Sequence, residues 1–434
     1  MHVLAISAND AWTIATAATC AVACGILGCF LVLRRLSLLG DAISHAILPG
    51  LAMAFILTAS RDVVPMLLGA TVVGVLTAGL SAAIHRWGRI PEDAAMGVVF
   101  TSLFAVGVIM MAWMPRSLDL DPGCVLYGVL ESTSLDTVHI AGIELPRAFT
   151  SLLVTLLLAA GFVTLCYKEL KLTSFDPALA SALGYSVALI HYTFISLVAA
   201  TAVVSFEAVG SILVIVMLIA PGATAHLLTD RLGRMILLAA GLATLSSVSG
   251  YLLAIYLDTS ASGMISVVSG AQFALAVFAA PRHGIISKAI TRAALSSRIA
   301  REDILGMLYR WNERKEVDPA AAPLAGGDIA LALRRPIAAR MAMRRLAREG
   351  LLVSDAAGVH LTRSGIERAR GIVRSHRLWE TFLANHLGLP LDHLHEPSHR
   401  VEHFITREMQ SELTTLAPDT DPHGKNIPPH HPAG

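Results

Sequence analysis

The chain has 434 residues, of which 55% are hydrophobic and only 15% are charged, and its mean hydropathy is +0.64. This composition is too apolar for a soluble protein and predicts an integral membrane protein. The net charge of +1 is unevenly distributed, because residues 1–281 hold 11 basic and 15 acidic side chains, whereas residues 282–434 hold 22 and 17. We therefore expect an apolar membrane part followed by a basic tail.

Nine apolar runs lie within residues 1–281, each near the length that crosses a bilayer. They cover residues 11–33, 43–60, 63–84, 94–114, 148–166, 186–206, 208–228, 234–257 and 261–281. Lys and Arg concentrate in alternate connections, so the positive-inside rule places the N-terminus outside and the C-terminal tail in the cytoplasm. We expect a multi-pass protein of the inner (cytoplasmic) membrane, surrounded by membrane lipid, with the acidic connection 115–147 outside.

Asp41 and His45 interrupt the second apolar region with two polar side chains. They are four residues apart, so on a helix they project from one face. A carboxylate beside a neutral imidazole can bind a divalent transition metal, and such groups in a membrane normally face the bundle interior or a water-filled path. The alternative is architectural: Asp41 follows Gly40 and could cap a helix, with His45 reaching toward a lipid headgroup.

A long cytoplasmic connection separates the fifth and sixth runs. It predicts a short amphipathic helix that starts at Ser174-Phe175-Asp176-Pro177 and ends near Gly184, with Pro near the first turn as is usual at a helix start. This helix is either an ordinary interfacial helix or a docking helix for a cytoplasmic partner.

Four segments of the first 281 residues resemble the permease subunits of ABC transporters for manganese, zinc and iron(II). They are LRRLSLLGDAISHAILPGLA, EDAAMGVVFTSLFAVGV, KELKLTSFDPALASALG and AVGSILVIVMLIAPGATAHLL. The resemblance implies a cytoplasmic ATP-binding subunit, an extracytoplasmic metal-binding lipoprotein and a second permease subunit, identical or different. It places Asp41 and His45 on the metal path and identifies a coupling helix that includes Phe175, Asp176, Pro177, Leu183 and Gly184.

The sequence contains no GxxxxGK[ST] motif, the loop that cradles nucleotide phosphates. We therefore expect the chain to be a transporter subunit and not an enzyme, with ATP hydrolysed by a separate subunit. A channel or a secondary transporter would not need such a subunit, and the predicted docking helix argues against both.

The tail has the pattern of a winged helix-turn-helix. Residues 302–311 predict an amphipathic helix, a linker follows at 318–323, and 326–350 predict two short helices with a turn near Arg334-Arg335-Pro336. Residues 351–362 then predict a β-hairpin wing. The basic side chains expected to contact DNA are Arg335, Arg340, Arg344, Arg345 and Arg348. The alternative is a solvated arginine face near anionic lipid headgroups.

Residues further along combine histidine and carboxylate at helical spacing. His399, Glu402 and His403 share one helical face, which suits metal chelation, although a solvated surface of these residues would look similar. The segments LTRSGIERARGIVRSHRLWETFLANHLGLP and HLHEPSHRVEHF resemble the dimerisation and metal-sensing region of the diphtheria-toxin-repressor family of manganese- and iron-responsive regulators. This resemblance spans about 302–425.

The repressor resemblance implies a set of metal ligands. His376, Glu402 and His403 match metal ligands of the family, Glu380 and His395 match ancillary ligands, and Asp303 matches an N-terminal acidic ligand. Two positions depart from the family pattern: His399 stands where Glu or Cys is usual, and Gly306 stands where relatives supply a second acidic or methionine-type ligand. The implied metal is Mn²⁺ or Fe²⁺, with Zn²⁺ as a third candidate.

The expected architecture is an all-α polytopic membrane protein of about nine transmembrane helices, followed by a cytoplasmic winged helix-turn-helix domain and a helical dimerisation domain. The expected boundaries are 1–284 for the permease, 285–325 for a helical connector and linker that include the first helix of the regulator, 326–364 for the winged helix, 365–425 for the metal-sensing domain and 426–434 for a disordered tail. The expected function is ATP-driven import of manganese, iron or zinc, coupled to a metal-responsive DNA-binding regulator. The alternative keeps the permease and makes the tail a cytoplasmic metal-sensing gate that closes the transporter without binding DNA.

Overall fold

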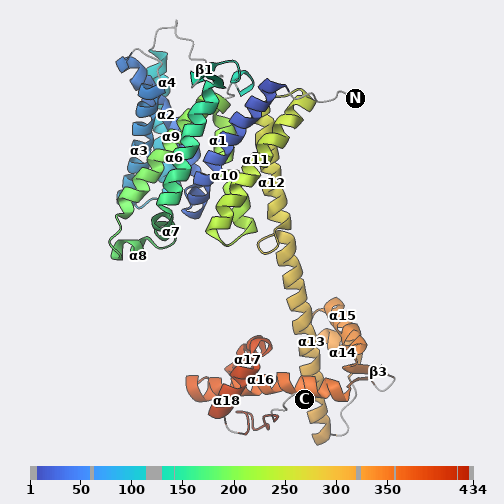
Figure 1. Cartoon of the computed structure of the whole chain (residues 1–434). Coiled ribbons are helices and arrows are strands. Elements are labelled where there is room, and N and C mark those ends of the chain that lie inside the picture. Colours follow the sequence, from blue (N-terminus) through green and yellow to red (C-terminus); the bar gives the residue numbers. More distant parts are fainter. Residues whose placement is uncertain are drawn as a thin grey trace. The chain divides into compact units, whose positions relative to one another are not determined.

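A computed structural model describes residues 7–58, 63–113, 130–140, 142–318, 324–355, 358–417 and 419–429. The chain forms two compact units, Met1–Lys288 and Ala289–Gly434 (Figure 1). Some of the expected features lie outside the described residues: Asp119 and Asp121 of the outer connection, residues 319–323 of the linker, and residues 430–434 at the C-terminal end.

The first unit is a bundle of long apolar helices with short elements between them. Its elements are α1 Ala8–Leu33, α2 Ser37–Thr58, α3 Val63–Gly88, α4 Glu92–Ala112, η1 Leu130–Ser132, β1 Thr137–Ile140, β2 Ile143–Pro146, α6 Arg147–Leu165, α7 Tyr167–Phe175, α8 Pro177–Ala182, α9 Val187–Val209, α10 Ser211–Leu228, α11 Leu232–Leu257 and α12 Ala261–Ala279. Nine of the helices in the described ranges are long and apolar enough to cross a membrane, which confirms the nine predicted runs.

Helix α1 packs against α10 at the centre of this bundle, and the two backbones approach closely. A Cβ atom on Gly28 would lie 2.0 Å from the carbonyl oxygen of Leu218, and one on Gly222 would lie 3.0 Å from the backbone nitrogen of Cys29. Helices in membranes associate through small residues of this kind, because apolar burial does not favour helix contact over lipid contact. The fully buried Leu27, Phe30 and Leu31 complete the packing of α1.

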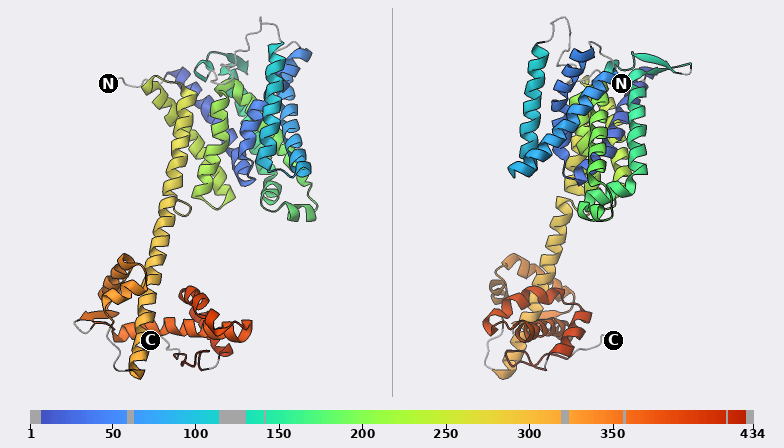
Figure 2. Two further views of the ribbon diagram at one scale, coloured as in Figure 1. Left: turned by 180° about the vertical axis from the view of Figure 1, so that it is seen from behind. Right: turned by 90° about the vertical axis from the view of Figure 1, so that its left-hand side faces the viewer.

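The short elements gather at the two ends of the bundle. The hairpin β1–β2 lies at the end where α1 begins, and α7 and α8 lie at the opposite end (Figures 1 and 2). The hairpin is antiparallel, with Thr137 opposite Pro146 and Ile140 opposite Ile143, and it was not predicted. The start of α1 and the predicted docking segment thus lie at opposite ends of the bundle, which agrees with their expected locations on different sides of a membrane.

The predicted docking helix, which starts at residues 174–177 and ends near Gly184, corresponds to α8. A helix that the sequence analysis did not predict, α7, precedes it, and the two helices separate at Asp176. Asp176 has an extended φ of −145° and its Oδ1 accepts a hydrogen bond from the Leu179 backbone N–H at 2.9 Å, so it caps α8. Pro177 cannot continue a preceding helix, which explains the break.

The second unit begins within one long helix. Its elements are α13 Ile285–Val317, α14 Gly326–Ala332, α15 Pro336–Arg348, β3 Leu352–Asp355, β4 Gly358–Leu361, α16 Arg363–Leu387, η2 Leu391–His393, α17 His395–Val401, η3 Glu402–Phe404 and α18 Arg407–Leu416. Helices α14 and α15 with the antiparallel pair β3–β4 confirm the predicted winged helix-turn-helix. The predicted helix at 302–311 is only the central part of α13.

Apolar side chains of α13 hold the winged-helix elements together. Ile304, Leu305 and Leu308 are buried in one cluster with residues from α14, α15 and both strands. A second cluster joins Leu378 of α16 to Ile405 and Leu413. Since α13 packs on the winged-helix elements through one face, its polar residues Glu302 and Asp303 remain available to the histidines that follow α16.

Candidate metal centres

Asp41 and His45 lie side by side on α2, as the four-residue spacing predicted. His45 Nε2 is 3.5 Å from Asp41 Oδ1, and the two side chains are 41% and 38% exposed. The His45 ring contacts Phe100 and Phe104 of α4, with centroid separations of 6.1 and 5.4 Å. Helix α2 begins at Ser37, one turn before Asp41, so the alternative in which Asp41 caps the helix is wrong.

Two protein ligands suit a cation in transit better than a resident one. A site that holds a metal permanently usually supplies at least three or four protein ligands. Asp41 and His45 offer one oxygen and one nitrogen from a partly exposed position. The rest of the coordination sphere would have to come from water or from another chain, which favours rapid release.

The predicted docking residues surround α8 on the surface of the bundle. Phe175 ends α7, and Leu183 and Gly184 follow α8. Phe175 and Leu183 are well exposed, and Gly184 has a φ of +87° that favours glycine. Large apolar side chains on a short exposed helix are a feature of surfaces that receive a partner.

Sequence reasoning missed the residue that ties this segment to the bundle. Arg34 follows α1, and its Nε and Nη2 donate to Ser174 Oγ and Thr173 Oγ1 of α7, each at 2.9 Å. The guanidinium also lies 4.9 Å from the centre of the Phe194 ring. In the sequence, the basic pair Arg34-Arg35 serves only as a topology signal, because nothing local to it points to α7.

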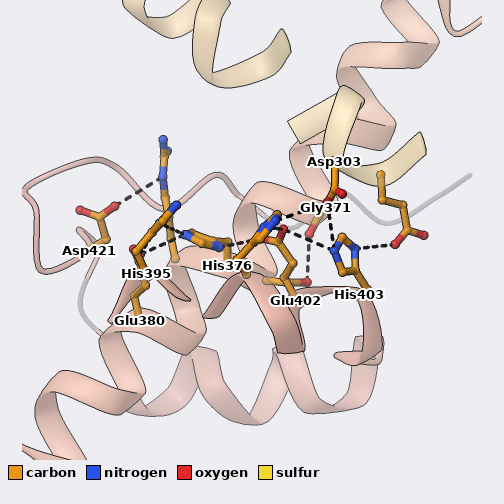
Figure 3. A network of polar contacts seen from close by, with 12 residues as sticks. Asp303, Gly371, His376, Glu380, His395, Glu402, His403 and Asp421 are labelled. Carbon is orange, nitrogen blue, oxygen red and sulfur yellow. Dashed lines mark hydrogen bonds and ion pairs between the residues drawn. The ribbon is translucent and has the colours of Figure 1, made fainter. Parts of the chain in front are cut away.

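The C-terminal unit brings four predicted ligands together in a first cluster, of which Figure 3 labels Asp303, Glu402 and His403. Asp303 comes from α13, His399 from α17, and Glu402 and His403 from η3. His403 Nε2 lies 3.1 Å from Asp303 Oδ1 and 3.7 Å from Glu402 Oε1. His399 lies 3.8 Å from Asp303 Oδ1 through Nε2 and 2.9 Å from Glu402 Oε1 through Nδ1.

Two of these close atoms lack a hydrogen bond. Asp303 Oδ1 and His403 Nε2 are both buried and form an ion pair at 3.1 Å, but neither atom makes a hydrogen bond of good geometry. A buried polar atom without a partner costs free energy unless something else satisfies it. Buried donor atoms that converge in this way, with only an ion pair between them, could bind a shared cation in place of the His403 proton, so these residues fit a metal site.

Three further predicted ligands form a second cluster that adjoins the first. His376 Nε2 lies 2.9 Å from Glu380 Oε1 and 3.1 Å from His395 Nδ1. On its other side, His376 Nδ1 lies 2.6 Å from Glu402 Oε2, so His376 stands between the two clusters (Figure 3). We expected His376 with Glu402 and His403; the structure groups it with Glu380 and His395, and all seven predicted ligands are in these two clusters.

Electrostatics within the clusters favour ionised carboxylates. Burial alone would raise the pKa of Glu402, but hydrogen bonds from His376 and His399 outweigh it and lower that pKa to about 2. Burial would also raise the pKa of Glu380, but hydrogen bonds from His376 and His395 lower that pKa to about 2. Burial would lower the pKa of His403, yet Asp303 and Glu302 raise it to about 9. The clusters therefore favour positive charge, which a divalent cation can supply in place of protons.

Two residues outside the predicted set orient His403. His403 Nδ1 lies 2.9 Å from Glu302 Oε2, and Arg298 Nε donates to Glu302 Oε1 at 2.9 Å. A carboxylate on the far nitrogen of an imidazole fixes the ring so that its other nitrogen faces a metal. Only the adjacency of Glu302 to Asp303 could have suggested this, because His403 is about one hundred residues away in sequence.

Gly306 is near the clusters but supplies no ligand. A Cβ atom there would find Arg310 Nη2 at 3.5 Å as its nearest neighbour, so space exists for a larger side chain. Arg310 acts on Glu402 through its charge. Where relatives supply a ligand, this chain therefore has Gly306 with the cationic Arg310 beside it.

The predicted DNA-contacting arginines all lie on the surface of the winged-helix part. Ala339, Ala342 and Leu346 form the buried face of α15, which leaves its polar side for solvent. The exposed residues are Arg335, Arg340, Arg344, Arg345 and Arg348. Arg345 lies 3.4 Å from Glu349, and Arg335 donates to Ser296 at 3.2 Å.

Comparisons with known proteins match both units. A model of the ABC 3 transport family matches residues 9–280, and one of the iron dependent repressor, metal binding and dimerisation domain matches residues 362–429. The manganese transport system membrane protein MntD of Bacillus subtilis is 44% identical over 280 residues, covering 64% of this chain and 95% of that protein.

A further relative and a solved structure also match the membrane part of the chain. The zinc transport system membrane protein TroD of Treponema pallidum is 34% identical over 354 residues, which cover 80% of this chain and 96% of that protein. The solved structure of PsaBC from Streptococcus pneumoniae in complex with Fab is similar with a TM-score of 0.54 and 31% identity, over 64% of this chain and 94% of that one.

Proposed function

The chain belongs to the ABC 3 transport family and carries an iron-dependent repressor domain, and from this premise we propose that it imports a divalent transition metal and senses the same class of metal. It is a multi-pass membrane protein and a permease subunit. The import is ATP-driven, with the N-terminus outside and the repressor domain in the cytoplasm.

Several features support the import function. Asp41 and His45 form a two-ligand contact for the ion, and the exposed segment around α8 receives a cytoplasmic ATP-binding subunit. A metal-binding lipoprotein delivers the ion on the outer side, and a second permease subunit completes the path. Relatives named for manganese and zinc transport support a divalent transition metal as cargo.

The single observation that carries the sensing function is the convergence of Asp303 Oδ1 and His403 Nε2, which are buried and 3.1 Å apart and make no hydrogen bond of good geometry. With His399 and Glu402 they would hold one cation, and His376, Glu380 and His395 would hold a second. The donors are nitrogen and oxygen without thiolate, which favours Mn²⁺ or Fe²⁺ over softer ions.

The sensing unit would regulate transcription through α15. Metal would order this unit into a dimer whose exposed arginines, including Arg340 and Arg344, contact DNA phosphates and base edges. The test is footprinting with the full chain in detergent on the DNA upstream of its own coding region. We expect protection that requires Mn²⁺ and disappears with His403→Ala; protection that persists in chelator would refute the role.

One observation favours the gate alternative. Helix α13 is continuous from Ile285 to Val317, so the ligand Asp303 belongs to the helix that starts just after the last apolar span. Metal at Asp303 could thereby act on transport without DNA. The double variant Arg344→Ala/Arg345→Ala separates the two functions, because it abolishes DNA binding under the first and leaves metal feedback on transport intact under the second.

A further inference from the structure

The C-terminal unit contains a cavity of about 680 Å³ beside the first metal cluster. Five arginines line this arginine cavity: Arg298, Arg368, Arg370, Arg374 and Arg407. Glu402 and His403 form part of its wall, together with residues of α16 and α18. The cavity therefore extends from the metal ligands to a strongly basic surface.

The positive charge of the arginine cavity is not balanced by its own acids. Of its three glutamates, Glu302 pairs with Arg298 at 2.9 Å, and Glu402 is held by His399 at 2.9 Å. This leaves Glu367 as the remaining carboxylate. Among the described residues, no ion pair involves the other four lining arginines, which are Arg368, Arg370, Arg374 and Arg407. Four unpaired guanidinium groups around one space repel one another unless an anion lies between them.

Arg374 gives a second, independent sign of a missing acceptor. It is only 7% exposed. Its Nη1 donates to the Pro428 carbonyl and its Nη2 donates to Thr414 Oγ1 at 2.7 Å, but its Nε is buried and has no hydrogen-bond partner. A buried charged donor without an acceptor is costly, and a ligand oxygen would remove that cost.

We propose that the arginine cavity binds a small organic anion that carries phosphate or carboxylate groups. Guanidinium groups bind both kinds of group through paired hydrogen bonds. Leu351, Ile372 and Ile405 provide apolar walls for a carbon skeleton, and the volume lies in the range of about 300–1,000 Å³ that is usual for small-molecule sites. This ligand is additional to the metal of the proposed sensing function, so the C-terminal unit responds to two signals.

The experiment is isothermal titration of the full chain in detergent with inorganic phosphate and, separately, with citrate. The chain is first depleted of metal, so that an anion binding to a bound cation cannot be mistaken for the site. We expect one site per chain with a Kd of about 1 mM or tighter for at least one of the two anions. Because no metal is present, the result is independent of whether the metal clusters function as proposed.

Variants assign the binding to the cavity. The double variant Arg368→Gln/Arg407→Gln changes two exposed side chains, so we expect it to fold normally and to weaken anion binding about tenfold or more. Arg374→Gln should weaken binding too, and the double variant decides if Arg374→Gln fails to fold. The matched control is Arg400→Gln, whose side chain pairs with Glu396 outside the cavity and should bind like the parent.

Three results would overturn the proposal. The first is that neither anion binds with a Kd of about 1 mM or tighter. The second is that the double variant binds as tightly as the parent. The third is that a short DNA duplex, titrated in the same way, is the only anionic species that binds through Arg368 and Arg407, which would assign these arginines to nucleic acid.

Discussion

Glu402 lies between two clusters and contacts both through different oxygens. Its Oε1 is 2.9 Å from His399 Nδ1, and its Oε2 is 2.6 Å from His376 Nδ1. A carboxylate shared in this way would couple two cations, since each would polarise the group that binds the other. Occupancy of one cluster should therefore affect affinity at the other.

His403→Ala tests the first cluster at the level of one ligand. The variant removes a nitrogen that faces Asp303 at 3.1 Å, so we expect Mn²⁺ affinity at this cluster to fall by more than the roughly 10–100-fold lost when an outer-shell partner is removed. Titration of the full chain measures the affinity. His360→Ala is the matched control, because His360 lies on β4 outside both clusters. Equal losses in the two variants would contradict the assignment.

The seven residues of the two clusters could be predicted from the sequence, because repressor-like motifs contain them and because His399, Glu402 and His403 are helical neighbours. Their grouping could not be predicted. His376 faces Glu380 and His395 on one side and Glu402 on the other. Which of these residues it groups with depends on how α16 packs against α17 and η3. Glu302 and Arg298 were missed for the same reason, since long-range contacts leave no local pattern.

Elements differ in how far their patterns determine them. The nine long helices follow from apolar length alone, because a segment in lipid must satisfy its backbone internally. The hairpin β1–β2 has no comparable signal in its four-residue strands. The extent of α13 was underestimated, since residues before 302 form an exposed helix without a strong apolar face. Helix α8 was predicted from Pro177 in its first turn, whereas the preceding α7 was not; the two helices separate at Asp176, which caps α8.

The crossing of α1 and α10 yields a prediction about stability. Gly28→Ala adds a Cβ atom that would lie 2.0 Å from the Leu218 carbonyl oxygen, so the two helices must separate. Overpacking typically costs about 1–3 kcal/mol, and displacement of a backbone should reach at least that value. Thermal unfolding in detergent measures the loss. Gly79→Ala on α3 is the control, because nothing lies within 4 Å of its Cβ position, and an equal loss there would refute the argument.

Arg34 should couple the docking segment to the transport path. Its two hydrogen bonds hold α7 against the end of α1, seven residues before Asp41. In the complex reconstituted with its ATP-binding subunit, we expect Arg34→Gln to lower the metal transported per ATP hydrolysed severalfold, because movement of α8 would no longer reach α1. Arg34→Lys keeps the charge without the paired geometry and should recover only part of the ratio.

A matched variant separates coupling from folding. Arg35→Gln changes the neighbouring arginine and should leave the transport-to-ATP ratio at the parent value. If Arg34→Gln reduced transport and ATP hydrolysis in equal proportion, Arg34 would be needed for stability or assembly and not for coupling.

At the scale of the whole molecule, one chain combines a permease of the ABC 3 transport family with an iron-dependent repressor domain. The proposed transport contact would use two ligands, Asp41 and His45, whereas the proposed sensing unit would use seven ligands in two clusters. Fewer ligands favour passage and more ligands favour retention. The difference in ligand number thus matches a site that must release its ion and a site that must report its concentration.

The central claim is that Asp41 and His45 contact the ion in transit, and uptake of radioactive Mn²⁺ by proteoliposomes of the full complex tests it most directly. The variant Asp41→Asn/His45→Gln keeps the size of both side chains and should fold and assemble, yet we expect its uptake rate to fall at least tenfold, since both ligands are weakened. The control His139→Gln alters an exposed imidazole on β1 and should transport at the parent rate. Uptake by the double variant at the parent rate would contradict the account.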